Sequence, residues 1–117
     1  MFRIKKQFHF SASHQLDRLP AGHPCARLHG HNYIVEIELQ SEQLNEYGFV
    51  LDYGDLKPFA NYLDEHFDHR HLNDLLPIPS SEYIAQHLFQ YAKQLWQSVV
   101  VVRVSETPRT WAEYTEV

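Results

Sequence analysis

The sequence predicts an α+β domain in which a four-stranded antiparallel sheet carries two helices on one face, in the order ββααββ. Apolar and polar residues alternate over residues 2–14 and again over 30–41, which predicts two strands. Apolar residues then recur every three to four positions in two successive segments, which predicts two helices. Two more extended segments end the chain.

The first two strands each place apolar side chains on a single face. Along residues 2–14 this face holds Phe8, Phe10, Ala12 and His14. Along residues 30–41 it holds Tyr33, Val35, Ile37 and Leu39. The intervening residues 15–29 contain Pro20, Gly22 and Pro24, so we expect a loop there. GFVLDY, at residues 48–53, is expected to be a short extended piece.

The two helices carry start signals. The first is expected to begin after Asp55, a suitable N-cap residue, with Pro58 in the first turn, where its missing N–H costs nothing. The second is expected to begin near Ser80, behind two prolines. The segment SVVVVRVSE that follows has the β-branched composition of a strand covered on both faces. A last short strand is expected over residues 110–116.

The predicted sheet has two open edges, and we expect its helix-free face still to carry apolar groups. Long exposed strand edges promote uncontrolled pairing, and closure of the sheet removes them. A chain of 117 residues buries its own surface only marginally. We therefore expect several subunits to join their sheets edge to edge into a barrel.

Composition limits the possible functions of what we expect to be one domain over residues 1–117. The formal net charge is −5 with no basic run, which argues against nucleic acid and anionic membranes as partners. No apolar run approaches the roughly 20 residues that span a bilayer. The N-terminus does not resemble a secretion signal, and one cysteine cannot form an internal disulfide, so we expect a cytoplasmic protein. Nine histidines are many for this length, and they cluster.

One histidine group has the spacing of a metal site. His29 and His31 start a predicted strand two residues apart, so both side chains point to the same side, and Gly30 leaves room for close approach. An antiparallel pairing would bring His14, at the end of the first strand, beside them. Three imidazoles suit zinc and leave a fourth position open, as in catalytic sites. The alternative is a set of loop histidines satisfied by hydrogen bonds.

The single cysteine, Cys25, has three possible roles. It could be a fourth zinc ligand in a closed structural site, or a buried small apolar residue. Its polar loop, with Arg27 and an expected metal cation nearby, argues against burial, and positive surroundings lower the pKa of a thiol and make it reactive. The residues alone do not decide between ligand and reactive thiol.

A second histidine group lies in EHFDHRHLND, residues 65–74. Asp68 next to His69 is a pair in which a carboxylate orients an imidazole and raises its basicity. His66 and His71 are more simply explained as cations favoured near a helix C-terminus. A second metal site is possible there, but the spacing does not indicate one.

Six motifs in order make the chain resemble the superfamily of 6-pyruvoyl- and 6-carboxy-tetrahydropterin synthases over nearly its full length. They are F-x-A-S-H at 10–14, C-x-x-x-H-G-H at 25–31, L-D-Y-G-D-L-K at 51–57, D-H-x-x-L-N-D at 68–74, P-S-S-E at 79–82 and S-E-T-P at 105–108. The resemblance implies the tunnelling fold, a barrel of trimers commonly stacked as hexamers, and active sites between subunits.

The resemblance also implies roles for individual residues. His14, His29 and His31 would be the zinc ligands, Cys25 the catalytic thiol, and Asp68 with His69 the proton relay. Glu106 would anchor the pterin ring, because a carboxylate can accept from the 2-amino group and the ring N–H together. Thr107 is a candidate for further ring contacts and Arg27 for contact with a triphosphate. His71 stands where a larger residue is common, which leaves open whether it or His69 handles the proton.

The spacing of the cysteine distinguishes two branches of the superfamily. Three residues separate Cys25 from His29, as in the bacterial enzymes of queuosine biosynthesis, whereas pyruvoyl-forming members have five. The resemblance therefore implies conversion of 7,8-dihydroneopterin triphosphate to 6-carboxy-5,6,7,8-tetrahydropterin with release of acetaldehyde and triphosphate. The alternatives are a pyruvoyl-forming or other pterin side-chain lyase, or a non-catalytic protein that binds zinc or pterin.

Overall fold

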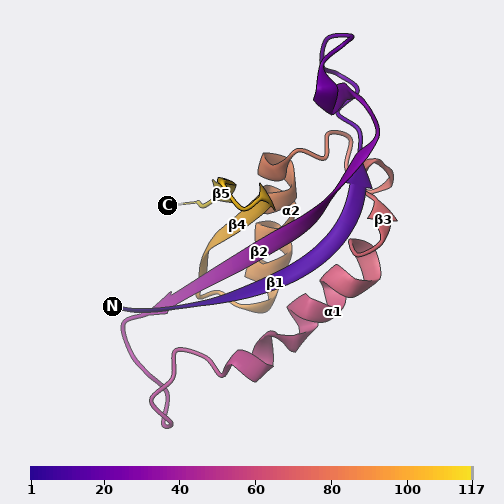
Figure 1. The fold of residues 1–117 in the computed structure, drawn as a ribbon. Helices are drawn as coiled ribbons and strands as arrows, with labels where there is room; N and C mark the ends of the chain where they lie inside the picture. The colour runs from indigo at the N-terminus through magenta and orange to yellow at the C-terminus, as the bar shows by residue number, and fades with distance from the viewer. Residues whose placement is uncertain (117) are drawn as a thin grey trace.

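The computed structural model describes residues 1–116, and Figure 1 shows a strongly curved sheet with two helices on one side of it. The sheet order is β3-β1-β2-β4-β5. Its four main strands are β1 (Phe2–His14), β2 (His29–Ser41), β4 (Val99–Thr107) and β5 (Thr110–Tyr114), and neighbouring members pair antiparallel. The predicted α+β class and ββααββ order of the main elements are confirmed.

The prediction of four strands misses a fifth. Strand β3 is only Arg70–His71, and it runs parallel to β1, opposite Ala12 and Ser13. A two-residue strand has no alternating pattern that a sequence could reveal. Its position matters because it attaches the segment after the first helix to the end of β1.

The start of the first helix also differs from the prediction. Helix α1 (Lys57–His66) is preceded by a 3-10 turn, Tyr53–Leu56, whose N-cap is Asp52; the Asp52 side chain accepts a hydrogen bond from Gly54 N–H. Asp55 therefore lies inside that turn rather than capping α1, and GFVLDY contains no strand. Pro58 does lie in the first turn of α1.

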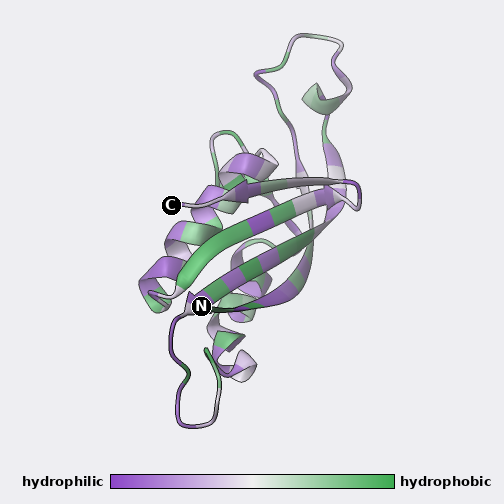
Figure 2. Ribbon diagram, turned by 90° about the vertical axis from the view of Figure 1, so that its left-hand side faces the viewer, coloured by the Kyte–Doolittle hydropathy of each residue, from purple (hydrophilic) through white to green (hydrophobic). Residues whose placement is uncertain are grey.

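Helix α2 (Ser81–Leu95) begins as predicted. Ser80 is its N-cap, and the Ser80 side chain accepts from Tyr83 N–H. The helix packs over β4 and β5, where Phe89 meets the ring of Tyr114 edge-on at 5.0 Å between centroids. The predicted apolar faces of β1 and β2 are buried beneath the helices, and Figure 2 shows the alternation of apolar and polar residues along the strands.

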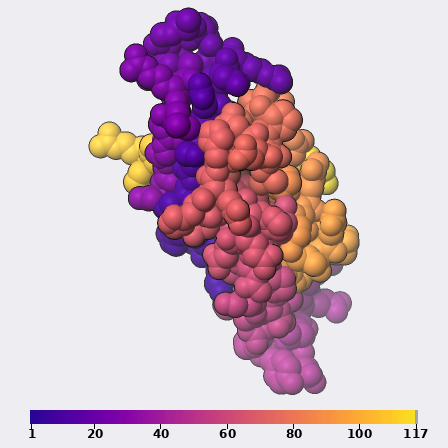
Figure 3. All heavy atoms as spheres, turned by 90° about the vertical axis from the view of Figure 1, so that its right-hand side faces the viewer, coloured from indigo at the N-terminus to yellow at the C-terminus, as the bar shows by residue number. Residues whose placement is uncertain are grey.

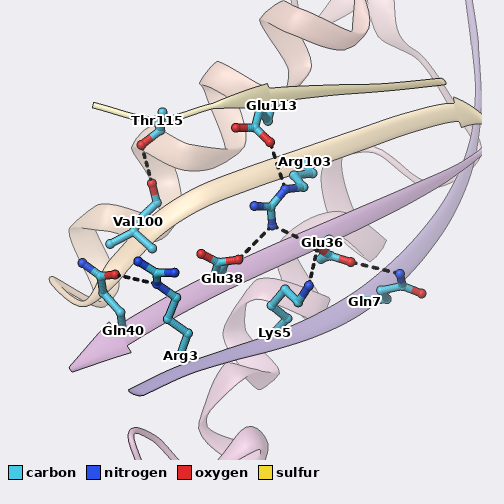
Figure 4. Close-up of polar contacts among 10 residues, drawn as sticks. All are labelled: Arg3, Lys5, Gln7, Glu36, Glu38, Gln40, Val100, Arg103, Glu113 and Thr115. Atoms are coloured by element: carbon cyan, nitrogen blue, oxygen red, sulfur yellow. Dashed lines mark hydrogen bonds and ion pairs between the residues drawn. The ribbon is translucent and has the colours of Figure 1, made fainter. Parts of the chain in front are cut away.

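The helix-free face of the sheet carries a charged network as well as the expected apolar groups, which include Ile34 and Val101. Arg103 of β4 lies between Glu36 and Glu38 of β2 and Glu113 of β5, at 3.0–3.1 Å from their carboxylate oxygens (Figure 4). Lys5 lies 3.9 Å from Glu36. Val101 is buried on this face, but both helices lie on the other one, so covering of β4 on both faces stays a prediction.

Two long loops extend from opposite ends of the body, as Figures 1 and 3 show for residues 15–28 and 42–52. Within residues 1–116, β1 has a strand partner on its outer edge only at Ala12 and Ser13, so most of this edge is open. No helix in this part of the chain is long and apolar enough to cross a bilayer.

Candidate active site

Three histidines from two strands converge at the end of the sheet next to the loop 15–28. His14 ends β1 and His29 starts β2, and the antiparallel register places them directly opposite each other. His31 follows on the same face, and the ligand atoms of all three lie within 4.8 Å of one another. A Cβ at Gly30 would lie 3.3 Å from the carbonyl oxygen of Ala12, so glycine allows the two strands to approach here. The predicted juxtaposition is confirmed.

Hydrogen bonds determine which ring nitrogens are free. His14 Nδ1 lies 2.7 Å from the carbonyl oxygen of Pro79, and His29 Nδ1 lies 2.7 Å from that of Arg27. A carbonyl only accepts, so each Nδ1 is the protonated nitrogen and each Nε2 carries a lone pair. These two Nε2 atoms face each other at 2.9 Å. Two lone pairs at this distance need a cation or a shared proton between them.

His31 supplies the third nitrogen. Its Nε2 is buried without a hydrogen-bond partner in the described residues, although it lies 3.4 Å from Glu106 Oε2. Burial lowers the pKa of His31, and the nearby His14 and His29 act in the same direction against the raising effect of Glu106. Metal ligation requires the neutral form of an imidazole, which a lowered pKa favours. The donor set therefore fits a metal ion with three protein ligands.

Groups that the sequence did not reveal hold His14 in place. The hydroxyl oxygen of Tyr33 lies 3.2 Å from His14 Nδ1. Burial, with Glu106 nearby, raises the pKa of Tyr33, so it remains a neutral phenol. Asn73 forms two 2.8 Å hydrogen bonds with the backbone of Gln15, one from Gln15 N–H to Oδ1 and one from Nδ2–H to the carbonyl. The L-N-D motif was the only sequence signal for this clamp.

Cys25 lies close to the histidines along the chain but outside their cluster. It is half-buried in a 3-10 turn, Pro24–Ala26, and its carbonyl accepts from Leu16 N–H at 3.1 Å. In the described residues, only the three histidines form a group of possible metal ligands, so the structure does not assemble a closed site with one cysteine and three histidines. Arg27 contributes its carbonyl to His29, and its side chain is exposed.

Asp68 and His69 follow α1 and form the expected pair. Asp68 Oδ1 accepts from Ser11 N–H at 2.9 Å, and Asp68 Oδ2 lies 2.9 Å from His69 Nδ1. The Ser11 hydrogen bond lowers the pKa of Asp68, and His69 lowers it further. His69 has a φ of 57°, an uncommon conformation for a residue other than glycine, and its side chain is 84% exposed. It lines the same 460 Å³ depression as His31.

The remaining histidines of this segment have other contacts. His71 Nδ1 lies 3.0 Å from Ser13 Oγ, and the ring of His66 packs against Tyr62 with centroids 4.8 Å apart. Neither belongs to a group of possible metal ligands among residues 1–116. No second metal site is assembled there.

Glu106 lies between the histidine cluster and a separate pocket. Its Oε2 is the atom near His31, while its Oε1 accepts from Ser81 Oγ–H at 2.6 Å. The 270 Å³ pocket is lined by Ser81, Glu82, Glu106, Thr110, Trp111 and Ala112. Thr107 Oγ1 pairs with Thr110 Oγ1 at 2.9 Å at the tip of the β4–β5 hairpin and is not among the lining residues. Sequence reasoning missed Ser81.

Comparison with known proteins gives consistent matches. Residues 3–117 match the family described as 6-pyruvoyl tetrahydropterin synthase. A protein of Archaeoglobus fulgidus is 39% identical over 104 residues, covering 89% of this chain and 87% of the relative. The 6-carboxy-5,6,7,8-tetrahydropterin synthase of Synechocystis is 38% identical over 96 residues, covering 76% and 73%. The solved 6-pyruvoyl tetrahydropterin synthase of Caenorhabditis elegans has a TM-score of 0.87 at 25% identity, covering 99% and 96%.

Proposed function

The chain belongs to the 6-pyruvoyl tetrahydropterin synthase family, and from this premise we propose that it is a zinc-dependent 6-carboxytetrahydropterin-forming lyase. It converts 7,8-dihydroneopterin triphosphate and water to 6-carboxy-5,6,7,8-tetrahydropterin, acetaldehyde and triphosphate, a step of queuosine biosynthesis. The observation that carries the proposal is the pair of opposed Nε2 lone pairs of His14 and His29, beside the unpartnered Nε2 of His31.

The three histidines would hold zinc, whose chemistry is to acidify hydroxyl groups and polarise a developing carbonyl. With three imidazole ligands, the metal would keep a fourth position available to the substrate. Glu106, 3.4 Å from His31, grips the 2-amino group and ring N–H of the pterin, so that the hydroxylated side chain lies toward the histidines. Thr107 adds contacts near the ring.

Protein side chains carry the proton transfers. The Cys25 thiolate takes a proton from the substrate side-chain carbon, and His69 donates or accepts another. Asp68 holds His69 through its Nδ1, leaving the other ring nitrogen directed outward for exchange. Arg27, exposed on the loop, is the candidate contact for triphosphate.

The choice of the carboxy-forming reaction rests on two supports. Cys25 and His29 are separated by three residues, and a relative that is 38% identical carries that name. The lone cysteine fits a cytoplasmic location. The open edge of β1 supports association into a trimer or hexamer, in which the active site lies between subunits.

Incubation of the purified, zinc-loaded protein with 7,8-dihydroneopterin triphosphate, followed by mass spectrometry, tests the proposal. The expected products are 6-carboxy-5,6,7,8-tetrahydropterin, acetaldehyde and triphosphate in equal amounts. A pyruvoyl product without acetaldehyde would assign the protein to the other branch of the family. Pterin binding with no turnover would indicate a non-catalytic binding protein.

A further inference from the structure

Two neighbouring serines at the start of α2 have different partners. The Ser80 hydroxyl oxygen accepts from Tyr83 N–H and caps the helix. The Ser81 hydroxyl donates instead to Glu106 Oε1 at 2.6 Å, joining α2 to β4. Both serines are half-buried, so exposure does not distinguish them. Ser80 therefore caps the helix, whereas Ser81 binds a carboxylate that lines a pocket.

The environment of Glu106 explains why its carboxylate needs a restraint. Its second oxygen, Oε2, lies 3.4 Å from His31 Nε2, so rotation about the side chain could bring the whole carboxylate onto the histidine cluster. The Ser81 hydroxyl holds Oε1 at the side of the pocket shared by Ser81 and Glu106. The N-terminus of the 15-residue α2 also favours negative charge at this position.

We propose that Ser81 is a positioning residue that sets the orientation of Glu106 for ring binding; this inference rests on the proposed function. A carboxylate offers about four lone-pair directions. Ser81 uses one of them on Oε1, which leaves one on Oε1 and two on Oε2, enough for the two adjacent N–H donors of a pterin ring. The short charge-assisted hydrogen bond fixes the plane of the carboxylate before the ring binds, so the side chain loses less conformational entropy on binding.

The test compares Ser81→Ala and Ser81→Thr with the matched control Ser80→Ala. The binding probe is unsubstituted pterin, which has the ring donors but no side chain to react, measured by calorimetry at equal metal content. Ser81→Ala should weaken pterin binding roughly 10-fold and raise KM for the triphosphate substrate similarly, with kcat within about twofold of wild type. Ser81→Thr, which keeps the hydroxyl, should restore both values. Ser80→Ala should lower Tm and leave pterin affinity unchanged.

Two results would overturn the inference: unchanged pterin affinity in Ser81→Ala, or an equal loss in Ser80→Ala, which would trace the effect to the helix end. The outcomes also separate this inference from the proposed function. Loss of pterin affinity in Ser81→Ala, when the wild type binds pterin but releases no acetaldehyde, would support Ser81 and refute the reaction. Turnover by the wild type, together with unaltered pterin affinity in Ser81→Ala, would support the reaction and refute the role of Ser81.

Discussion

Two polar clusters lie on opposite faces of β2, and they differ in whether their polar atoms find hydrogen-bond partners within the cluster. On the helix-free face, one guanidinium, Arg103, meets three carboxylates of opposite charge (Figure 4). On the covered face, three imidazoles converge, and within residues 1–116 no opposite charge lies within hydrogen-bond distance of His14 or His29. Both clusters use alternate residues of the same strand.

In the Arg103 cluster each charged side chain has a hydrogen-bond partner within the cluster. Burial works against the charged guanidinium, but hydrogen bonds to Glu38 and Glu113 raise the pKa of Arg103 above its ordinary value. Glu36 also accepts from Arg103, so each carboxylate has a donor. Such a network holds β2, β4 and β5 together and leaves nothing for a ligand to satisfy.

The histidine cluster is balanced only by something added to it. The lone pairs of His14 and His29 face each other at 2.9 Å, and His31 Nε2 has no hydrogen-bond partner in the part of the chain that the structure describes. Native proteins rarely leave buried polar atoms unpaired, so an exception of this kind indicates a binding site. The two clusters therefore differ in charge and also in whether each buried polar atom has a hydrogen-bond partner.

If the histidine cluster is open to substrate, Cys25 is a catalytic base and not a ligand. Cys25→Ala tests this and should have the largest effect of the variants. If Cys25 is the catalytic base, turnover should fall roughly 10²- to 10⁴-fold, the range for loss of a general base, while zinc stays bound. Product formation and metal analysis on the same sample measure both. Loss of zinc in this variant would make Cys25 a fourth ligand and the cluster a closed site.

Zinc should stabilise the protein through the histidines alone. At a thousandfold excess over Kd, a ligand specific to the folded state adds about 4 kcal/mol. We expect this gain in wild type and in Arg103→Met but not in His29→Ala, measured by urea unfolding with and without zinc. An equal gain in His29→Ala would show that zinc binds elsewhere.

Arg103→Met should lower the stability of the protein equally with and without zinc, unlike His29→Ala. Its side chain is only 23% exposed, so removing it leaves the largely buried Glu38 without its ion-pair partner and leaves Glu36 with only Lys5, 3.9 Å away. We expect a loss of about 2 kcal/mol in the free energy of unfolding, irrespective of zinc. Glu113→Gln is the control, because the 54% exposed carboxylate of Glu113 should contribute less than about 1 kcal/mol. Equal losses in both variants would contradict a balanced buried network.

Among the stability effects, Asp68→Asn should produce the smallest, a change in the pH dependence of the free energy of unfolding. The pKa of Asp68 lies below its ordinary 3.8 in the folded protein, because Ser11 N–H and His69 favour the carboxylate. Asp68 therefore adds stability above about pH 4 that is lost as pH falls through the lowered pKa. The variant should lose less stability on acidification from pH 7 to 3. Parallel acid profiles would refute this role.

The parts of the molecule that were predictable are those with a repeating pattern. The alternation of apolar and polar residues predicted both ends of β1 correctly, and antiparallel pairing then placed His14 opposite His29. Strand β3 escaped prediction because a two-residue parallel pairing has no period. Asp52, and not Asp55, is a cap because a 3-10 turn precedes α1 and Asp52 caps that turn. Residue propensities do not distinguish such a turn from the first turn of the α-helix.

The contacts that complete the site were not predictable for a different reason. Pro79 O on His14 and Ser81 on Glu106 join segments 65 and 25 residues apart. Such contacts depend on how α2 packs over the sheet, and no local spacing encodes that packing. The P-S-S-E motif marked this segment but not which serine would reach Glu106.

Zinc content per chain after equilibrium dialysis tests the central claim most directly. We predict one zinc per chain in wild type, in Cys25→Ala and in Arg103→Met, and close to none in His29→Ala. Undiminished zinc in His29→Ala would contradict the assignment of the three histidines and, with it, the proposed site.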